Sequence, residues 1–414
     1  MNKNKKVLLK NTVMLYILRF STYFFSFITV PYQTRVLGVS IYGKIGIATA
    51  LMMYFQLFLD FGFLLSATEE VARNRDNKKI VCEVMTSVNL IKICFSVISV
   101  IVLYGICSFV PQYRADKLLF FLYLMQAIAV SFQPDYIYRG LENMTMVTYR
   151  TVFTKALFTG MIFIFLKKPE DYYCVPAIML LGELIATGWS FFDLKKHYGI
   201  TFVKVNVQDV MARLKHSSTF FLSRIISTVY TATNTVILGF LDPAGITVGY
   251  YTAAYKLIST GQNALSPISD SIYPYMINNK DFKLVKKVLS LTMPIIFIGG
   301  VVIFIFADKI CYLFFGADFA PAGEVLRGMM PLAVLTLPDY ILGFPTLGAM
   351  GLANHANISI YVSSAVHVIN LIVLSYLGKL NAVSLAWLMS VATAIEVLYR
   401  LIVVLKNKDK MKGC

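Results

Sequence analysis

The feature that most constrains this chain is a series of long apolar stretches, each long enough to cross a lipid bilayer. A transmembrane helix needs about 20 consecutive residues that are mostly apolar. Because 57% of the 414 residues are hydrophobic and only 14% are charged, a water-soluble core could not bury them all. The sequence therefore predicts an all-α integral membrane protein with about 12 transmembrane helices. The twelve stretches are residues 12–35, 43–66, 83–109, 117–138, 145–166, 174–194, 217–241, 249–275, 285–307, 325–344, 356–378 and 382–405.

Lysine and arginine residues gather at the ends of alternate stretches, and this pattern predicts the orientation of the chain. Basic clusters lie before the first stretch, after the second, sixth and eighth, and at the end of the chain. Cytoplasmic connections of membrane proteins carry the excess of basic residues. We therefore expect a multi-pass protein with both termini in the cytoplasm. The net charge of +16 then reflects topology, and we expect no nucleic-acid partner.

The segment RVLGVSIYGKIG, residues 35–46, contains a pattern similar to a nucleotide-binding loop. Gly38 to Lys44 reads G-x-x-x-x-G-K, but a phosphate-binding loop continues with Ser or Thr and follows a buried strand. Here Ile45 follows the lysine, and an apolar stretch too long for a strand precedes the glycine. We therefore reject nucleotide binding for this segment.

Residues that ligate metals show no characteristic spacing in this chain. The six cysteines contain no C-x-x-C pair, and the four histidines are scattered. Zinc sites and disulfide frameworks have recognisable spacings. We expect no metal site, no cofactor, and cysteines that are free thiols.

Short matches at a constant offset indicate that the chain contains two repeats. The sequence PDYI occurs at residues 134–137 and again at 338–341, an offset of 204. Leu-Lys followed nine residues later by an arginine occurs at Arg19 and again at Arg224, an offset of 205. Each match alone is weak, but the shared offset makes a duplication the best interpretation.

The repeats predict how the chain is divided and where it binds a substrate. We expect an N-terminal six-helix lobe with the linker at residues 1–210 and a C-terminal six-helix lobe at residues 211–414. Two halves that enter the membrane in the same orientation are typical of transporters that bind substrate between the halves, near the midplane. Such transporters work by alternating access.

Five basic residues lie well inside apolar stretches. At the centre of a lipid-facing helix each would cost about 2.5 to 3.5 kcal/mol. We therefore predict that they line a cavity and bind an anionic headgroup, above all one with phosphate. The alternative for each is a side chain that reaches the membrane surface or forms a local ion pair. The five are Arg19, Lys92, Lys155, Arg224 and Lys256.

Four acidic residues also lie within apolar stretches. A carboxylate in a membrane can exchange a proton or bind a monovalent cation, and so couple transport to an ion gradient. The alternative for each is a salt bridge within one lobe. The four candidates for ion coupling are Asp60, Glu183, Asp270 and Glu396.

Four segments carry a resemblance to a known family: RVLGVSIYGKIG (35–46), DFGFLLSATEEVARNRDN (60–77), QPDYIYRGLENM (133–144) and VGYYTAAYKLI (248–258). With them the chain resembles the Wzx-type O-antigen and polysaccharide flippases of the multidrug/oligosaccharidyl-lipid/polysaccharide exporter superfamily. The resemblance covers most of the chain. The family pattern after the first helix reads much like R-x-L-G-x-x-x-Y-G, which implies that Gly38 and Gly43 form a tight turn between two helices.

The resemblance implies a non-enzymatic, V-shaped carrier in the bacterial cytoplasmic membrane. Such a carrier flips undecaprenyl-pyrophosphate-linked oligosaccharide from the inner to the outer leaflet by ion antiport. In related flippases an arginine on the first helix and a cation on the eighth hold the pyrophosphate, and Arg19 and Lys256 occupy these places here. Its partners would be the lipid-linked oligosaccharide, membrane lipids and other polysaccharide assembly proteins. Asp135-Tyr136 stands where family members frequently have D-W-[FY], and two helices typical of lipid II flippases are missing.

The sequence is also compatible with two other functions. A multidrug antiporter of the same superfamily would favour acids over bases in its cavity, which the basic bias of this chain opposes. A membrane glycan polymerase would present a large outer loop with paired catalytic groups. The longest predicted outer loop, near residues 308–322, has no convincing acid and base pair.

Overall fold

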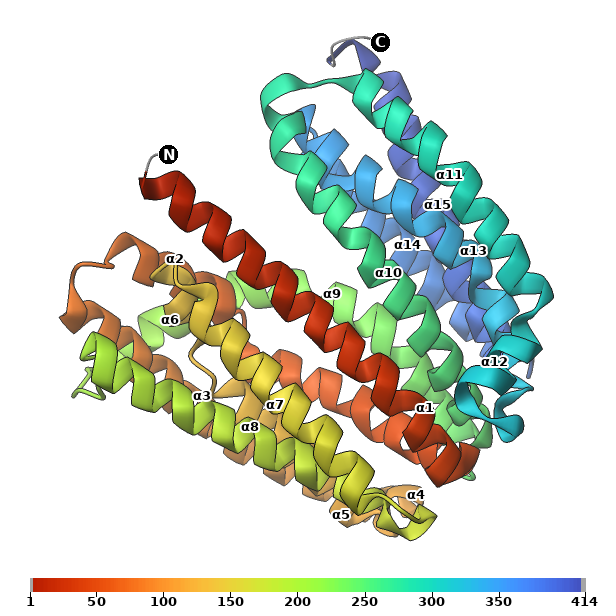
Figure 1. Ribbon diagram of the computed structural model, residues 1–414, viewed down its shortest axis with the longest axis horizontal. Helices are drawn as coiled ribbons and strands as arrows, with labels where there is room; N and C mark the ends of the chain where they lie inside the picture. The colour runs from red at the N-terminus through yellow and green to blue at the C-terminus, as the bar shows by residue number, and fades with distance from the viewer. Residues whose placement is uncertain (1–2, 411–414) are drawn as a thin grey trace. The chain divides into compact units, whose positions relative to one another are not determined.

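The chain folds almost entirely into helices, which Figure 1 shows in order from the N-terminus to the C-terminus. The helices form two compact units, Met1–Ala232 and Thr233–Cys414. The division falls inside one long helix, α9 (Val207–Leu241). The computed structural model describes the backbone of residues 3–410, and it describes their side chains except those of residues 3–9, 12, 222–224 and 226–231.

Each of the predicted apolar stretches lies mostly in helical structure. Among the described residues, eight helical segments are long and apolar enough to cross a membrane, judged by length and composition. The longest, Val13–Arg73, contains the first two predicted stretches. In α11 (Phe282–Ile305), only 6% of the most apolar window is buried within the protein. A helix that exposes apolar side chains along its whole length needs lipid around it.

Unit 1 is built from α1 to α8 and the first part of α9. Both α1 and α8 pack against α5 and α7, and the short α2 packs on α6. Buried apolar residues of α2, α3 and α6 form a continuous core. The elements are α1 (Lys3–Asp60), α2 (Phe63–Arg73), α3 (Lys78–Phe109), α4 (Pro111–Arg114), α5 (Lys117–Ser131), α6 (Asp135–Gly140), α7 (Met144–Phe165), η1 (Pro169–Tyr173), α8 (Cys174–Asp193) and η2 (Leu194–Tyr198).

The first two predicted stretches form one helical segment that is interrupted at Gly38. This residue has φ 71° and ψ 174°, a combination that is essentially restricted to glycine. A Cβ at this position would meet no atom within 4 Å, so the backbone conformation, and not lack of space, requires glycine. Gly43 lies in the helix that follows and is buried.

The lysine of the G-x-x-x-x-G-K pattern forms a structural ion pair. Nζ of Lys44 lies 2.9 Å from Oδ2 of Asp116, a buried residue at the start of α5. The hydroxyl of Tyr172 donates a second hydrogen bond to this carboxylate, at 2.9 Å. The charge of Lys44 is therefore neutralised within unit 1, and the residue joins α1 to α5.

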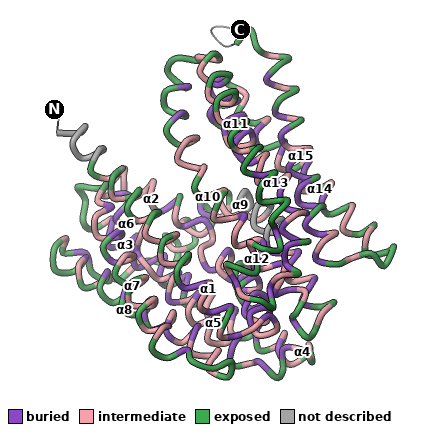
Figure 2. The backbone as a smooth tube through the Cα atoms, turned by 45° about the vertical axis from the view of Figure 1, so that its right-hand side comes forward, coloured by how far each residue is buried: buried purple, intermediate pink, exposed green. Residues whose placement is uncertain are grey.

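Unit 2 is built around α13, which packs against α10 and α15, while α14 packs against α15. Buried residues of α10, α13, η4 and α15 form its core, and Figure 2 shows how buried and exposed residues alternate along the helices. The helix α13 runs into a π-helical turn, η4, in which Gly343 departs from helical geometry with φ −63° and ψ −127°. The elements are α10 (Ile246–Asn279), α11 (Phe282–Ile305), α12 (Ala307–Phe315), η3 (Ala317–Phe319), α13 (Ala322–Ile341), η4 (Leu342–Gly348), α14 (Ala353–Tyr376), α15 (Ala382–Lys406) and η5 (Lys408–Lys410).

The predicted lobes, residues 1–210 and 211–414, follow the repeat in the sequence, whereas the compact units divide inside α9. The first part of this helix, up to Ala232, belongs to unit 1. The ends of a sequence repeat and the ends of a compact unit need not coincide, so the predicted lobe boundary stays a prediction.

We predict that Gly38→Ala destabilises the protein by roughly 1 to 3 kcal/mol, because alanine is strained in this backbone conformation. The measurement is thermal unfolding of the purified protein in detergent. Gly105→Ala is the matched control, since Gly105 lies in regular helix α3 and has no atom within 4 Å of a Cβ position. Alanine should be tolerated or favourable there. Equal stability of the two variants would contradict the argument.

Candidate functional site

The predicted cation Lys92 is held inside unit 1. The residue lies on α3, is 4% exposed, and its Nζ donates a hydrogen bond to the main-chain oxygen of Ser131. The ammonium group also lies 5.6 Å from the centre of the Tyr136 ring. A cation within about 6 Å of an aromatic face is stabilised by the ring. Lys92 therefore has internal partners that replace water.

The other four predicted cations have different surroundings. Lys155 on α7 is half-buried, and the described residues provide no hydrogen-bond or ion-pair partner for its ammonium group. Arg19 on α1 is exposed and Lys256 on α10 is half-buried, and each has further interactions within the chain. Arg224 lies on α9, but its side chain is outside the described residues. Lys256 belongs to unit 2 and the others to unit 1, so a common cavity for all of them stays a prediction.

Two of the predicted acidic residues accept hydrogen bonds from glutamine side chains in unit 1. Asp60, at the end of α1, accepts one from Nε2 of Gln56 at 3.0 Å. Glu183, on α8, accepts one from Nε2 of Gln133 at 2.6 Å. Hydrogen bonds from neutral amides stabilise a carboxylate without cancelling its charge. The roles of Asp60 and Glu183 in ion coupling stay predictions.

A buried arginine that the sequence analysis overlooked pairs with the aspartate of the first PDYI segment. Arg150 on α7 is 1% exposed, and its Nη2 lies 2.6 Å from Oδ1 of Asp135. Its Nη1 donates a hydrogen bond to Oγ of Ser190 at 2.7 Å. Because Arg150 lies near the end of its apolar stretch, it looks like an interfacial residue in the sequence. The repeated aspartate of PDYI was the signal that could have found this pair.

The aspartate of the second PDYI segment, Asp339, also binds a buried arginine. Arg400 on α15 is 5% exposed, and its Nη1 lies 2.8 Å from Oδ1 and 2.6 Å from the main-chain oxygen of Asp339. Its Nη2 binds Glu396, and its Nε donates a hydrogen bond to Oγ of Ser359 at 2.8 Å. Arg400 therefore ties α13, α14 and α15 together.

The two units build this cluster from different helices. In unit 1 the arginine comes from α7 and the serine from α8, whereas in unit 2 the serine comes from α14 and the arginine from α15. The arginine and the serine have thus exchanged helices, while the aspartate has kept its place in PDYI. The charges also differ, because Arg150 pairs with one carboxylate and Arg400 with two.

A cavity of about 380 Å³ borders the Arg400 cluster in unit 2. Asp270 and Tyr273 line it from α10, Asp339 lines it from α13, and Glu396 and Arg400 line it from α15. With all groups ionised, three carboxylates face one guanidinium, which leaves two negative charges in excess. Two of the predicted ion-coupling residues, Asp270 and Glu396, therefore border the same cavity.

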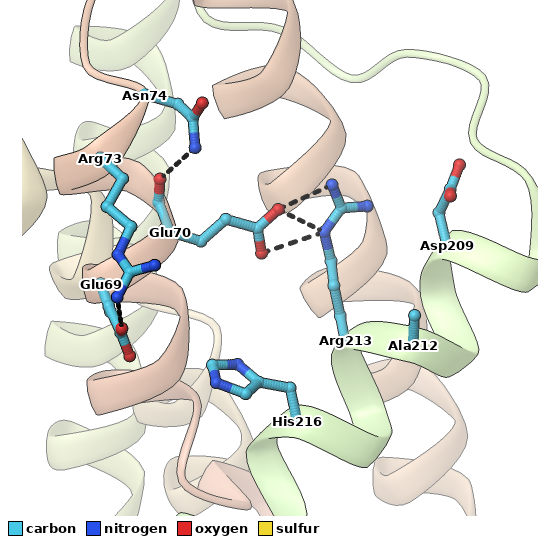
Figure 3. Close-up of a pocket in the computed structure, with 8 residues that line it drawn as sticks. All are labelled: Glu69, Glu70, Arg73, Asn74, Asp209, Ala212, Arg213 and His216. Carbon is cyan, nitrogen blue, oxygen red and sulfur yellow. Dashed lines mark hydrogen bonds and ion pairs between the residues drawn. The ribbon is translucent and has the colours of Figure 1, made fainter.

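Another hollow, of about 470 Å³, lies in unit 1 between α2 and the start of α9 (Figure 3). Nε and Nη2 of Arg213 lie 3.0 and 2.9 Å from Oε1 of Glu70, and Nη1 donates a hydrogen bond to Ser87 at 2.9 Å. On α2, Arg73 binds Glu69 at 2.5 Å. Because carboxylates already occupy both guanidinium groups, this hollow is not arranged to bind phosphate.

The same part of α2 holds the first part of α9 in unit 1. Oγ of Ser66 lies 2.6 Å from Oγ of Ser217, and the rings of Phe61 and Phe221 stack with their centres 4.4 Å apart. A Cβ at Gly62, where φ is 79°, would lie 2.8 Å from the main-chain oxygen of Ser217. Only glycine permits this approach of the two backbones. These contacts explain why α9 begins in unit 1.

The sequence matches a known family and two curated relatives. The family described as polysaccharide biosynthesis protein matches residues 8–280. A protein of Escherichia coli (strain K12), named as a candidate O-antigen transporter, is 27% identical over 354 residues, which cover 84% of this chain and 85% of the relative. A protein of Shigella dysenteriae with the same name is 25% identical over 334 residues, which cover 78% of this chain and 82% of the relative.

Solved transporter structures have the same fold. The lipid II flippase MurJ, in an inward closed conformation, matches with a TM-score of 0.72 and 14% identity, covering 96% of this chain and 89% of that chain. A multidrug resistance transporter of the MATE family, from the MOP superfamily and inward-facing, matches with a TM-score of 0.69 and 15% identity, covering 94% of this chain and 96% of that chain. The predicted fold class, an all-α membrane protein with the fold of these transporters, is confirmed.

We predict that Asp135→Ala destabilises the protein by about 3 to 5 kcal/mol, because the buried Arg150 then keeps its charge without a carboxylate. Thermal unfolding in detergent measures the loss. The double variant Asp135→Leu with Arg150→Met removes both charges and should recover most of the stability. A double variant as unstable as the single one would show that the pair contributes through something other than charge.

Proposed function

Because the chain belongs to the family of polysaccharide biosynthesis proteins, we propose that it flips a lipid-linked oligosaccharide across the bacterial cytoplasmic membrane. The family match over residues 8–280 is the observation that carries this proposal. Relatives named as candidate O-antigen transporters cover most of the chain, and a lipid II flippase shares its fold. The two curated relatives are named as transporters and not as enzymes. This chain is likewise a multi-pass membrane protein.

The proposed substrate is an oligosaccharide repeat unit, such as an O-antigen unit, linked to undecaprenyl pyrophosphate. Its headgroup would enter a cavity that opens to the cytoplasm while its lipid tail stays in the bilayer. A change of conformation would then expose the headgroup on the outer side, as in other alternating-access carriers with repeats. In this orientation both termini are cytoplasmic, as the distribution of basic residues predicts.

Among the predicted cations with a described side chain, Lys155 is best placed to bind the pyrophosphate. It is half-buried on a membrane helix, and the described residues provide no partner for it. An ammonium group in a membrane needs an anion or water to offset its charge. Lys92, in contrast, is held by protein groups and serves the structure of unit 1. Arg19, Arg224 and Lys256 would complete the phosphate site.

Movement of the headgroup would be driven by ion antiport. The candidates that would exchange a proton or a monovalent cation are carboxylates within membrane helices. Glu396 and Asp270 border the cavity of unit 2, and Asp60 and Glu183 each accept a hydrogen bond from a glutamine side chain. This environment supports exchange at each of them.

We predict that Lys155→Ala lowers surface polysaccharide by roughly tenfold, because one charge-assisted contact to phosphate contributes about 1.5 to 3 kcal/mol. Surface polysaccharide is measured in a strain that depends on this chain, and the amount of protein in the membrane is measured in parallel. Lys155→Arg keeps the charge and should keep activity. Lys92→Ala should instead reduce the amount of folded protein. Normal polysaccharide with Lys155→Ala would remove this residue from the phosphate site.

We predict that Arg19→Ala combined with Arg224→Ala abolishes surface polysaccharide while the protein stays in the membrane. The two residues occupy equivalent positions in the repeat, so they would approach the pyrophosphate together. Accumulation of lipid-linked oligosaccharide on the inner leaflet is the direct measurement. Full activity of the double variant would refute this assignment, and drug resistance with normal polysaccharide export in a deletion strain would favour a multidrug antiporter.

A further inference from the structure

The Arg400 cluster contains one more carboxylate than its counterpart in unit 1. Asp339 binds Arg400 from another helix, α13, whereas Glu396 binds it from its own helix, one turn earlier. In unit 1, the only carboxylate paired with Arg150 among the described residues is Asp135. Arg150 cannot lose its partner without leaving a buried charge, which is strongly unfavourable. Arg400 can lose Asp339, because Glu396 still neutralises it.

Arg400 also holds the break at the end of α13. Its Nη1 binds both the carboxylate and the main-chain oxygen of Asp339, four residues before Gly343. A Cβ at Gly343 would lie 2.9 Å from the same Nη1, so the guanidinium packs directly on the non-helical residue of η4. The geometry of this turn therefore depends on where Arg400 lies.

The cavity beside the cluster gives a proton a route to Asp339. Its volume of about 380 Å³ is enough for on the order of ten water molecules at about 30 Å³ each. Asp339 lines this cavity together with Glu396 and Arg400. The other titratable groups that line the cavity are Asp270 and Tyr273 on α10 and Tyr340 on α13. On the helices beside it, His355 of α14 bonds to the hydroxyl of Tyr399 of α15.

We propose that Asp339 is the proton-binding group of a latch in unit 2. When Asp339 takes up a proton, its carboxyl no longer holds Arg400, which stays paired with Glu396 on α15. The tie between α13 and α15 is then reduced to the hydrogen bond from Nη1 of Arg400 to the main-chain oxygen of Asp339, so the contact that fixes the geometry of η4 is weakened. Among the described residues, Arg150 in unit 1 has no second carboxylate as an ion-pair partner, so this pair stays closed.

The role of this latch as the ion-coupling step of transport rests on the proposed function. The opening of the latch when Asp339 takes up a proton does not. A proton from the outer side would open the latch, and release of that proton to the cytoplasm would close it again. The coupling ion would then be a proton.

Hydrogen exchange of the purified full-length protein in detergent tests the latch without any substrate. Between about pH 8 and pH 5, after correction for intrinsic exchange, peptides that cover residues 339–352 should lose protection by roughly tenfold, a change of about 1.4 kcal/mol. Asp339→Asn should show the low protection at both pH values. Unchanged protection of this segment in the wild-type protein would overturn the proposal.

Two further variants keep the test decisive if Asp339→Asn does not fold. With Glu396→Gln, Arg400 depends on Asp339 alone, so residues 339–352 should stay protected at both pH values. The double variant Asp135→Leu with Arg150→Met is the matched control from unit 1 and should leave the pH response of η4 intact. A wild-type response in Glu396→Gln would overturn the proposal.

Flipping of a fluorescent undecaprenyl-pyrophosphate-linked sugar in proteoliposomes separates the latch from the proposed function. If the wild-type protein flips this lipid with a proton gradient and Glu396→Gln does not respond to the gradient, the latch couples transport. If exchange shows the latch but the wild-type protein flips no lipid, the proposed function fails and the latch stands. If Glu396→Gln flips lipid with the wild-type response to the gradient, the assignment of the latch to coupling is overturned.

Discussion

The structure depends on a strict rule for charge among apolar helices, namely that a buried ion must have a partner within the protein. Water is not available to compensate an isolated charge in such surroundings. Arg150 and Arg400 are almost fully buried, and each is held by an aspartate and a serine from neighbouring helices. These clusters join neighbouring helices. Apolar packing alone would allow such helices to slide along one another.

The two clusters share one constraint but differ in their helices and charges. The aspartate of PDYI has the same position in both halves, but the arginine and the serine have exchanged helices. Unit 2 has also gained Glu396, which borders a cavity, so its arginine has a choice of carboxylates. A charge that has two partners can move, whereas a charge with one partner is fixed. We regard this difference as the origin of different roles for the two halves.

Sequence reasoning identified the apolar helices and the family because these depend on local composition and short motifs. It identified Gly38 as a turn residue, and the backbone there has a conformation restricted to glycine. It grouped Lys92 with the substrate cations because a sequence cannot show that Ser131 and Tyr136 surround the ammonium group. It overlooked Arg400 although Glu396 lies one turn earlier on the same helix, since the other partner, Asp339, lies 61 residues away in the sequence.

The sequence by itself determined that this chain is a helical membrane protein, because the length of the apolar stretches matches the thickness of a lipid bilayer. Only the tertiary structure decided which charges have partners. It paired Lys44 with Asp116 and Arg213 with Glu70, and it placed Arg400 between two carboxylates. The physical reason is that the energy of a charge depends on its neighbours within a few ångströms, and packing chooses those neighbours.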